Sequence, residues 1–239
     1  MNARKLIKII VDVFMYLLFV YLMCLSTTRF NSKCFGLTPQ TWHGIAGIFL
    51  FAIFVVHHVL NKSFYKSTFK GRYNAERIIL SATDWIFFIL MILMAISSIL
   101  LAGQAFPFIH SPYLSGAKPF HILICTWAFF VMSVHMSLHF DRFLFKLEHK
   151  INSRAVRWIL FTVLYALVLA CGIYSYIGQS LYVFMFTKNS FKLSPENIWL
   201  SMLEFIFISF AVCVLVHGIK SFVRAVRRGQ NEKLNAEKE

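Results

Sequence analysis

The sequence predicts an all-α, polytopic membrane protein in which six transmembrane helices form a bundle. Of its 239 residues, 59% are hydrophobic and only 14% are charged, whereas a soluble domain has about 45–50% apolar and about 25% charged residues. Six apolar stretches are each long enough to cross about 30 Å of hydrocarbon as a helix of about 20 residues. This composition excludes a water-soluble globule and a disordered chain, because neither could accommodate so much apolar side chain.

The predicted spans follow one another with short connections. Chain turns at residues 36–39 and at Pro119 precede the second and fourth spans. In chain order the spans cover residues 6–26, 41–61, 78–102, 119–140, 156–178 and 198–220. We expect residues 1–150 to form a four-helix core, residues 151–225 to add a further pair of transmembrane helices, and residues 226–239 to form a polar cytoplasmic tail.

The distribution of basic residues predicts the orientation. The chain has 24 Lys and Arg and a net charge of +14, which in a soluble protein would suggest nucleic acid. Here only five of the 24 lie in segments 27–40, 103–118 and 179–197, and the other 19 lie in or beside the termini and the remaining two loops. Because basic loops stay in the cytoplasm, both termini are predicted to be cytoplasmic in a multi-pass protein of the cell membrane, with no nucleic-acid partner.

Several classes of site find no support in the sequence. The five cysteines form no CxxC or CxxCH pattern, which argues against zinc, iron–sulfur and c-type haem sites. A disulfide between Cys24 and Cys34, near the outer end of the first span, is left open. There is no GxGxxG after a strand, no P-loop and no HExxH, so no nucleotide or metalloprotease site is expected.

Histidines carry the clearest functional signal. Six of the nine lie in two spans: His43, His57 and His58 in the second, and His121, His135 and His139 in the fourth. The interval of 14 residues from His43 to His57 recurs from His121 to His135. Fourteen residues are about four helical turns, so each pair shares one helix face and is separated by about 21 Å along the axis.

The second and fourth spans run in the same direction, because one span returns the chain between them. His43 and His121 are therefore predicted near the outer face, and His57 and His135 near the inner face. Each of two b-type haems needs two axial nitrogens from opposite sides, so these pairs predict an outer haem and an inner haem. Gly44 and Gly47 would leave room for a porphyrin edge. The expected fold is thus a six-helix membrane bundle with a four-helix di-haem core.

Alternatives exist for each position. A single intramembrane histidine often only bridges helices, and a metal-transport pathway would add carboxylates at matching depth, which the second and fourth spans lack. His58 and His139 are the alternate ligands, since angle alone discriminates poorly between His57 and His58. His139 lies about 27 Å from His121 along the axis, nearer the headgroups than His135.

The remaining polar residues suggest supporting roles. Asp12, Asp84 and His139 would form a quinone or proton site beside the inner haem, although an i,i+4 ion pair from Lys8 to Asp12 is the structural alternative. His110, His149 and His217 are expected at the surface or interface. Basic residues proposed to face haem propionates are Lys62 and Arg142 inside, and Arg29 and Lys118 outside.

The strings HGIAGIFLFAIFVVHHVLN and HILICTWAFFVMSVHMSLHF resemble the haem-binding helices of the flavinylation-associated transmembrane cytochromes. These are bacterial four-helix proteins in the wider group of formate-dehydrogenase-gamma-like and ferric-reductase-like di-haem cytochromes. The resemblance covers residues 6–142 and matches His57 with Asn61, and His135 with His139 and Phe140. It implies membrane electron transfer to or from flavin-bearing extracytoplasmic partners.

The sequence thus predicts a di-haem cytochrome b that carries electrons between a cytoplasmic-side or quinone donor and an extracytoplasmic, flavinylated acceptor. A second hypothesis is a haem-bearing anchor subunit of a larger quinone-linked oxidoreductase, and a third is a haem-free transporter. Whether the chain is itself an enzyme is open, because no polar segment is long enough to hold a flavin or nicotinamide domain.

Overall fold

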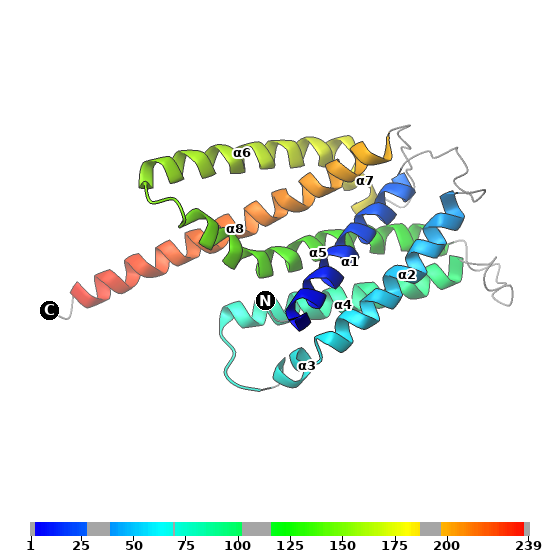
Figure 1. Cartoon of the computed structure of the whole chain (residues 1–239), viewed down its shortest axis with the longest axis horizontal. Helices are drawn as coiled ribbons and strands as arrows, with labels where there is room; N and C mark the ends of the chain where they lie inside the picture. The colour runs from blue at the N-terminus through cyan, green and yellow to red at the C-terminus, as the bar shows by residue number, and fades with distance from the viewer. Residues whose placement is uncertain (1–2, 28–38, 69, 102–115, 187–196, 237–239) are drawn as a thin grey trace.

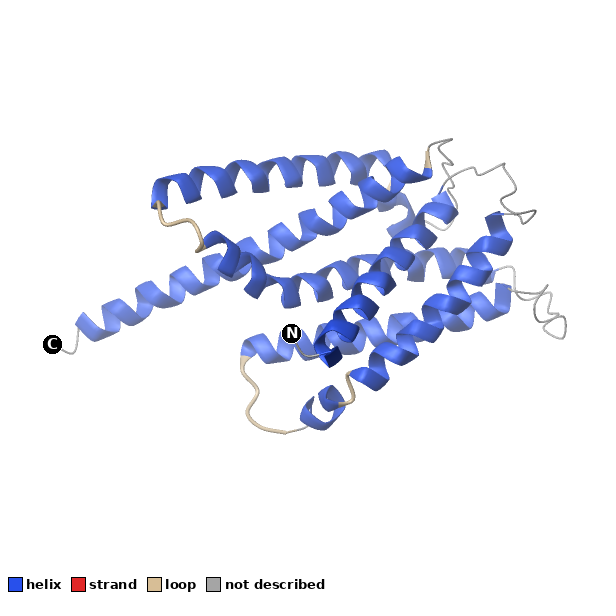
Figure 2. Cartoon of the chain, in the orientation of Figure 1, coloured by secondary structure: helices blue, strands red, loops and turns tan. Residues whose placement is uncertain are grey.

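The computed structural model describes residues 3–27, 39–68, 70–101, 116–186 and 197–236. All regular secondary structure in these ranges is helical (Figure 2). In chain order the helices are α1 (Ala3–Thr27), α2 (Pro39–Leu60), α3 (Ser63–Thr68), α4 (Ala75–Leu101), α5 (Ala117–Glu148), α6 (Arg154–Gly178), α7 (Leu181–Phe186) and α8 (Ile198–Ala236).

Six of the described helices (α1, α2, α4, α5, α6 and α8) are long and apolar enough to cross a membrane. They coincide with the six predicted spans, so the predicted all-α bundle is confirmed. Two helices run beyond the apolar stretches, α5 to Glu148 and α8 to Ala236. The segments that follow these two spans are rich in Lys, Arg, Glu and Leu, which have high helix propensity, so each helix continues past its apolar stretch.

Helices α4, α5, α6 and α8 run roughly along the long axis of the molecule, whereas α1 and α2 lie at a steeper tilt in this view (Figure 1). The helix α8 packs against α1, α5 and α6, while α4 packs against α5 and α1 against α2. Aromatic and apolar side chains fill the interior, with Val20, Phe54, Met91, Phe129 and Phe205 among the most buried. We call the end that carries the first turns of α1, α4 and α6 and the last turns of α2, α5 and α8 the basic end.

The outer faces of the bundle are apolar. Ile48 and Val59 of α2, Val163 of α6 and Phe222 of α8 are among many large hydrophobic side chains that are more than half exposed. Such a surface is unfavourable in water but suits the hydrocarbon of a bilayer. The chain is therefore a multi-pass membrane protein.

The short helix α3 is fixed at the basic end by Arg77. The Arg77 guanidinium donates hydrogen bonds to the backbone oxygens of Ser67, Lys70 and Arg72, at 2.5–3.2 Å. Gly71, with φ of +86°, supplies the left-handed residue in this turn. The turn holds α3, and with it Tyr65, against the last turn of α2.

Helices α5 and α8 are parallel and carry a regular series of polar contacts. Ser133 bonds Ser209 (Oγ–Oγ, 3.2 Å), Ser137 bonds Cys213 (Oγ–Sγ, 3.2 Å), and Asp141 bonds His217 (Oδ1–Nδ1, 2.7 Å); each pair joins residues 76 apart. Successive contacts advance by four residues on both helices, as expected for one face of each. This constant register fixes α8 on α5 down to the basic end.

Candidate functional site

His43 of α2 and His121 of α5 lie next to each other. Their ring centroids are 6.2 Å apart and their planes are inclined by 78°. Two imidazoles that bind one metal ion from opposite sides have centroids about 6 Å apart, because each nitrogen lies about 2 Å from the metal. The predicted outer pair thus has the separation that a shared iron requires.

Hydrogen bonds orient both rings of this pair. The Ser97 hydroxyl of α4 donates to the Met94 carbonyl oxygen (2.9 Å) and lies 2.9 Å from His121 Nδ1. Because its one hydrogen is used, Ser97 accepts from Nδ1–H of His121, so Nε2 carries the lone pair and accepts from the Cys125 thiol at 3.4 Å. His43 in turn bonds the Leu22 backbone. The Ser97 contact orients the His121 ring, as is usual for a metal-binding imidazole, and a metal at Nε2 would take the place of the weak thiol contact.

Gly44 and Gly47 place no side chain beside His43 on α2. A Cβ atom built on Gly44 or on Gly47 would meet nothing within 4 Å. Gly47 lies one turn from His43, so the helix presents no side chain there. The residues present, two neighbouring imidazoles beside a glycine one turn along α2, fit a bis-histidine haem.

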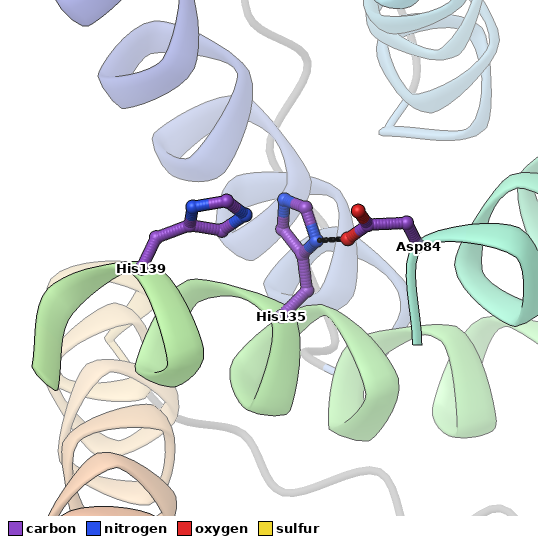
Figure 3. A group of neighbouring side chains, drawn as sticks. All are labelled: Asp84, His135 and His139. Atoms are coloured by element: carbon purple, nitrogen blue, oxygen red, sulfur yellow. Dashed lines mark hydrogen bonds and ion pairs between the residues drawn. The ribbon is translucent and has the colours of Figure 1, made fainter. Parts of the chain in front are cut away.

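The two predicted inner ligands each face a carboxylate. His57 Nδ1 lies 2.7 Å from Asp12 Oδ1 of α1, and His135 Nδ1 lies 2.7 Å from Asp84 Oδ1 of α4 (Figure 3). A carboxylate only accepts hydrogen bonds, so it holds the ring proton on Nδ1 and leaves Nε2 free to bind a metal. Asp12 therefore orients His57 of α2, and Asp84 orients His135 of α5, in the same way.

His58 has a different partner. Its Nδ1 lies 2.5 Å from the Tyr65 hydroxyl, and its ring packs between Phe54 and Phe88 within electrostatic range of His135. Burial raises the pKa of Tyr65, which keeps the phenol a donor. A phenol that donates to Nδ1 leaves the ring hydrogen on Nε2. By its tautomer, His57 is thus the better metal-binding ring, but by position His58 is the ring within electrostatic range of His135. Among the described residues no ring contact joins His57 to His135, unlike the outer pair.

His139 extends the group around His135. The two rings, one turn apart on α5, have centroids 4.8 Å apart, and Asp84 reaches them from α4 (Figure 3). One ligand atom from each of Asp84, His135 and His139 lies within 4.8 Å of the others. Two imidazoles and a carboxylate are also a ligand set for a transition-metal ion, so His135 has two possible uses.

Two expectations about these acids need correction. Lys8 does not form an ion pair with Asp12. The Lys8 ammonium donates to Asn61 Oδ1 at 2.8 Å, and the Asp12 carboxylate pairs with His57 instead. The second and fourth spans contain no carboxylates, but this does not exclude a metal pathway. Neighbouring helices supply carboxylates at the same depth: Asp12 comes from α1 and Asp84 from α4.

The prediction that His217 lies at the surface or interface was wrong. His217 is only 3% exposed; its Nδ1 lies 2.7 Å from Asp141 Oδ1 and its Nε2 3.1 Å from Glu148 Oε1. The two N–H groups of an imidazolium match these two carboxylates. Lys220 and Arg224 hold Asp141 Oδ2 at 3.0 and 3.1 Å.

This group, which we call the His217 network, extends to Glu76 through Lys220 (2.8 Å) and to Tyr165 through Glu148 (2.8 Å). It joins α4, α5, α6 and α8 at the basic end. With His217 protonated, its three acids and three bases balance, which is the condition under which charges can be buried. No sequence motif predicts the His217 network, because its residues lie far apart along the chain.

The remaining predicted residues lie partly outside the described part of the structure. His149 is exposed at the end of α5 and bonds the Phe145 carbonyl oxygen at 2.8 Å. Lys62 and Lys118 are exposed near the ends of α2 and α5. Cys24 is buried among the apolar side chains of the core. His110, Arg29 and Cys34, and the side chain of Arg142, lie outside the described part of the structure.

No protein-family model, curated protein or solved structure matches this chain. Its function must therefore be argued from the site itself.

Proposed function

We propose that the chain is an integral membrane di-haem cytochrome b. It would carry single electrons across a bacterial cytoplasmic membrane, between a cytoplasmic-side or quinone donor and an extracytoplasmic acceptor, with both termini in the cytoplasm. His43 and His121 would hold the outer haem iron, and His57 and His135 the inner one. Bound haem supplies one-electron oxidation and reduction.

The observation that best supports this proposal is the opposed pair His43 and His121, at 6.2 Å between ring centroids. Each ring also bonds a neighbouring helix, His121 the Ser97 hydroxyl of α4 and His43 the Leu22 backbone of α1. These bonds help to hold the helices together, but they do not explain why the two rings lie next to each other. The inner ligands are supported differently: Asp12 and Asp84 would orient the rings of His57 and His135 and raise the basicity of Nε2.

The acceptor is proposed from the resemblance alone. His57 with Asn61, and His135 with His139 and Phe140, match motifs of the flavinylation-associated cytochromes, which suggests a flavin-bearing extracytoplasmic partner. In the structure the Asn61 side chain donates to the His57 carbonyl oxygen at 2.9 Å and accepts from Lys8. The alternative within this proposal is an anchor subunit of a quinone-linked oxidoreductase, which would co-purify with a catalytic subunit.

A second candidate function rests on Asp84, His135 and His139. Their ligand atoms lie close enough together to hold a divalent transition-metal ion, as in a haem-free transporter. Occupation of this group would take His135 away from haem, so the two functions compete for one residue.

A haemochromogen assay with metal analysis of the purified protein separates the two. The cytochrome proposal predicts two b haems per chain and two iron atoms. A colourless protein that binds zinc or manganese stoichiometrically, and loses the metal in His139→Ala, would overturn it in favour of the transporter.

A further inference from the structure

A pocket lies at the basic end between the end of α5 and the first three turns of α6. Its lining residues include Glu148 of α5 and, on α6, Arg154, Arg157, Trp158, Phe161 and Tyr165. Ser153 is the N-cap of helix α6 and fixes its first turn, because its hydroxyl accepts a hydrogen bond from the Val156 N–H. The two arginines lie three residues apart, so they share one side of α6.

The charges of the pocket do not balance. Glu148 is already matched, since its Oε1 accepts from the Tyr165 hydroxyl and from His217 Nε2. The guanidinium groups of Arg154 and Arg157 have no hydrogen-bond or ion-pair partner among the residues that the structure describes. Arg157 is nevertheless half-buried. The pocket therefore keeps two uncompensated guanidinium groups, whose planar arrangement of donors suits the oxygens of a phosphate.

The surface around the pocket is suited to a lipid. Trp158 is 70% exposed beside the arginines, and Ile159 and Val163 continue an exposed apolar face along α6. An indole at the end of a span prefers the headgroup level of a bilayer. A molecule that placed its phosphate at the arginines could therefore lay alkyl chains along α6. A free phosphate ion would make no use of this apolar face.

We propose that this pocket binds the phosphate of an anionic phospholipid, which Arg154 and Arg157 would contact while its acyl chains lie on α6. The site is separate from the histidine pairs and does not depend on the proposed function. Basic pockets between transmembrane helices are a recognised form of lipid site.

The test is a titration of the purified full-length protein in detergent with phosphatidylglycerol or phosphatidylcholine, followed by native mass spectrometry. The double variant Arg154→Gln/Arg157→Gln is compared with Arg227→Gln/Arg228→Gln, which removes the same charge from exposed positions of α8 outside the pocket. We expect the pocket variant to bind phosphatidylglycerol about 30-fold more weakly, about fivefold for each arginine. The α8 variant should change by less than twofold, and phosphatidylcholine binding should be weak throughout.

Equal losses in the two double variants would overturn the proposal, because they would show a diffuse attraction to the basic end. Competition by millimolar sodium phosphate would equally overturn the lipid assignment and identify free phosphate as the ligand. If the glutamine variant is poorly folded by thermal unfolding, Arg154→Lys/Arg157→Lys serves in its place. It should keep most of the charge attraction and lose the selectivity that the paired guanidinium donors provide.

Discussion

Replacing Asp141 by asparagine should destabilise the bundle strongly. Asp141 is 2% exposed and pairs with His217, Lys220 and Arg224 through 2.7–3.1 Å contacts. The asparagine would leave the His217 network with three cations against two acids, and removal of one partner from a buried ion pair costs about 3–5 kcal/mol. Since Lys220 and Arg224 are partly exposed and water can solvate them, we expect the lower figure, about 3 kcal/mol.

The matched control is Glu76→Gln. Glu76 belongs to the same network and pairs with Lys220 at 2.8 Å, but its side chain is 67% exposed, so its loss should cost less than about 1 kcal/mol. Reversible unfolding by SDS, followed by tryptophan fluorescence of the protein in mixed micelles, measures both free-energy changes. If Asp141→Asn destabilised the protein no more than Glu76→Gln, the reasoning about burial would be refuted.

Two further changes have defined outcomes. In Gly172→Ala, the added Cβ would overlap that of Ala211 where α6 crosses α8, so we expect a loss of about 1–3 kcal/mol; Gly178→Ala, where a Cβ meets nothing within 4 Å, should be neutral, and equal effects in SDS unfolding would refute the close crossing. His57→Ala should remove the inner haem while His58→Ala retains both, by haem content and reduced-minus-oxidised spectra. The opposite pattern would identify His58 as the ligand.

The positions of the spans could be predicted from the sequence because each depends on local composition. The juxtaposition of His43 and His121 could also be predicted, since it follows from a repeated 14-residue interval and the parallel direction of two spans. The ends of the helices were harder to predict. Helix α8 continues to Ala236 because charged residues with high helix propensity extend it beyond the apolar stretch from which the span was predicted.

The partners of the histidines could not be predicted. Asp12 reaches His57 and Asp84 reaches His135 across helix interfaces, and such contacts depend on rotation of each helix about its axis. His217 was misjudged for the same reason. Its position near the end of a span suggests the interface, but α5 continues past Asp141 and covers it.

The most direct measurement of the central claim is the haem content of His121→Ala beside the unaltered protein. The account predicts two b haems per chain in the unaltered protein, and one in the variant with the inner-haem spectrum retained, because the two pairs lie about 21 Å apart along the helices. His149→Ala, at an exposed histidine outside both pairs, should keep both haems. A colourless unaltered protein, or two haems retained in His121→Ala, would contradict the account.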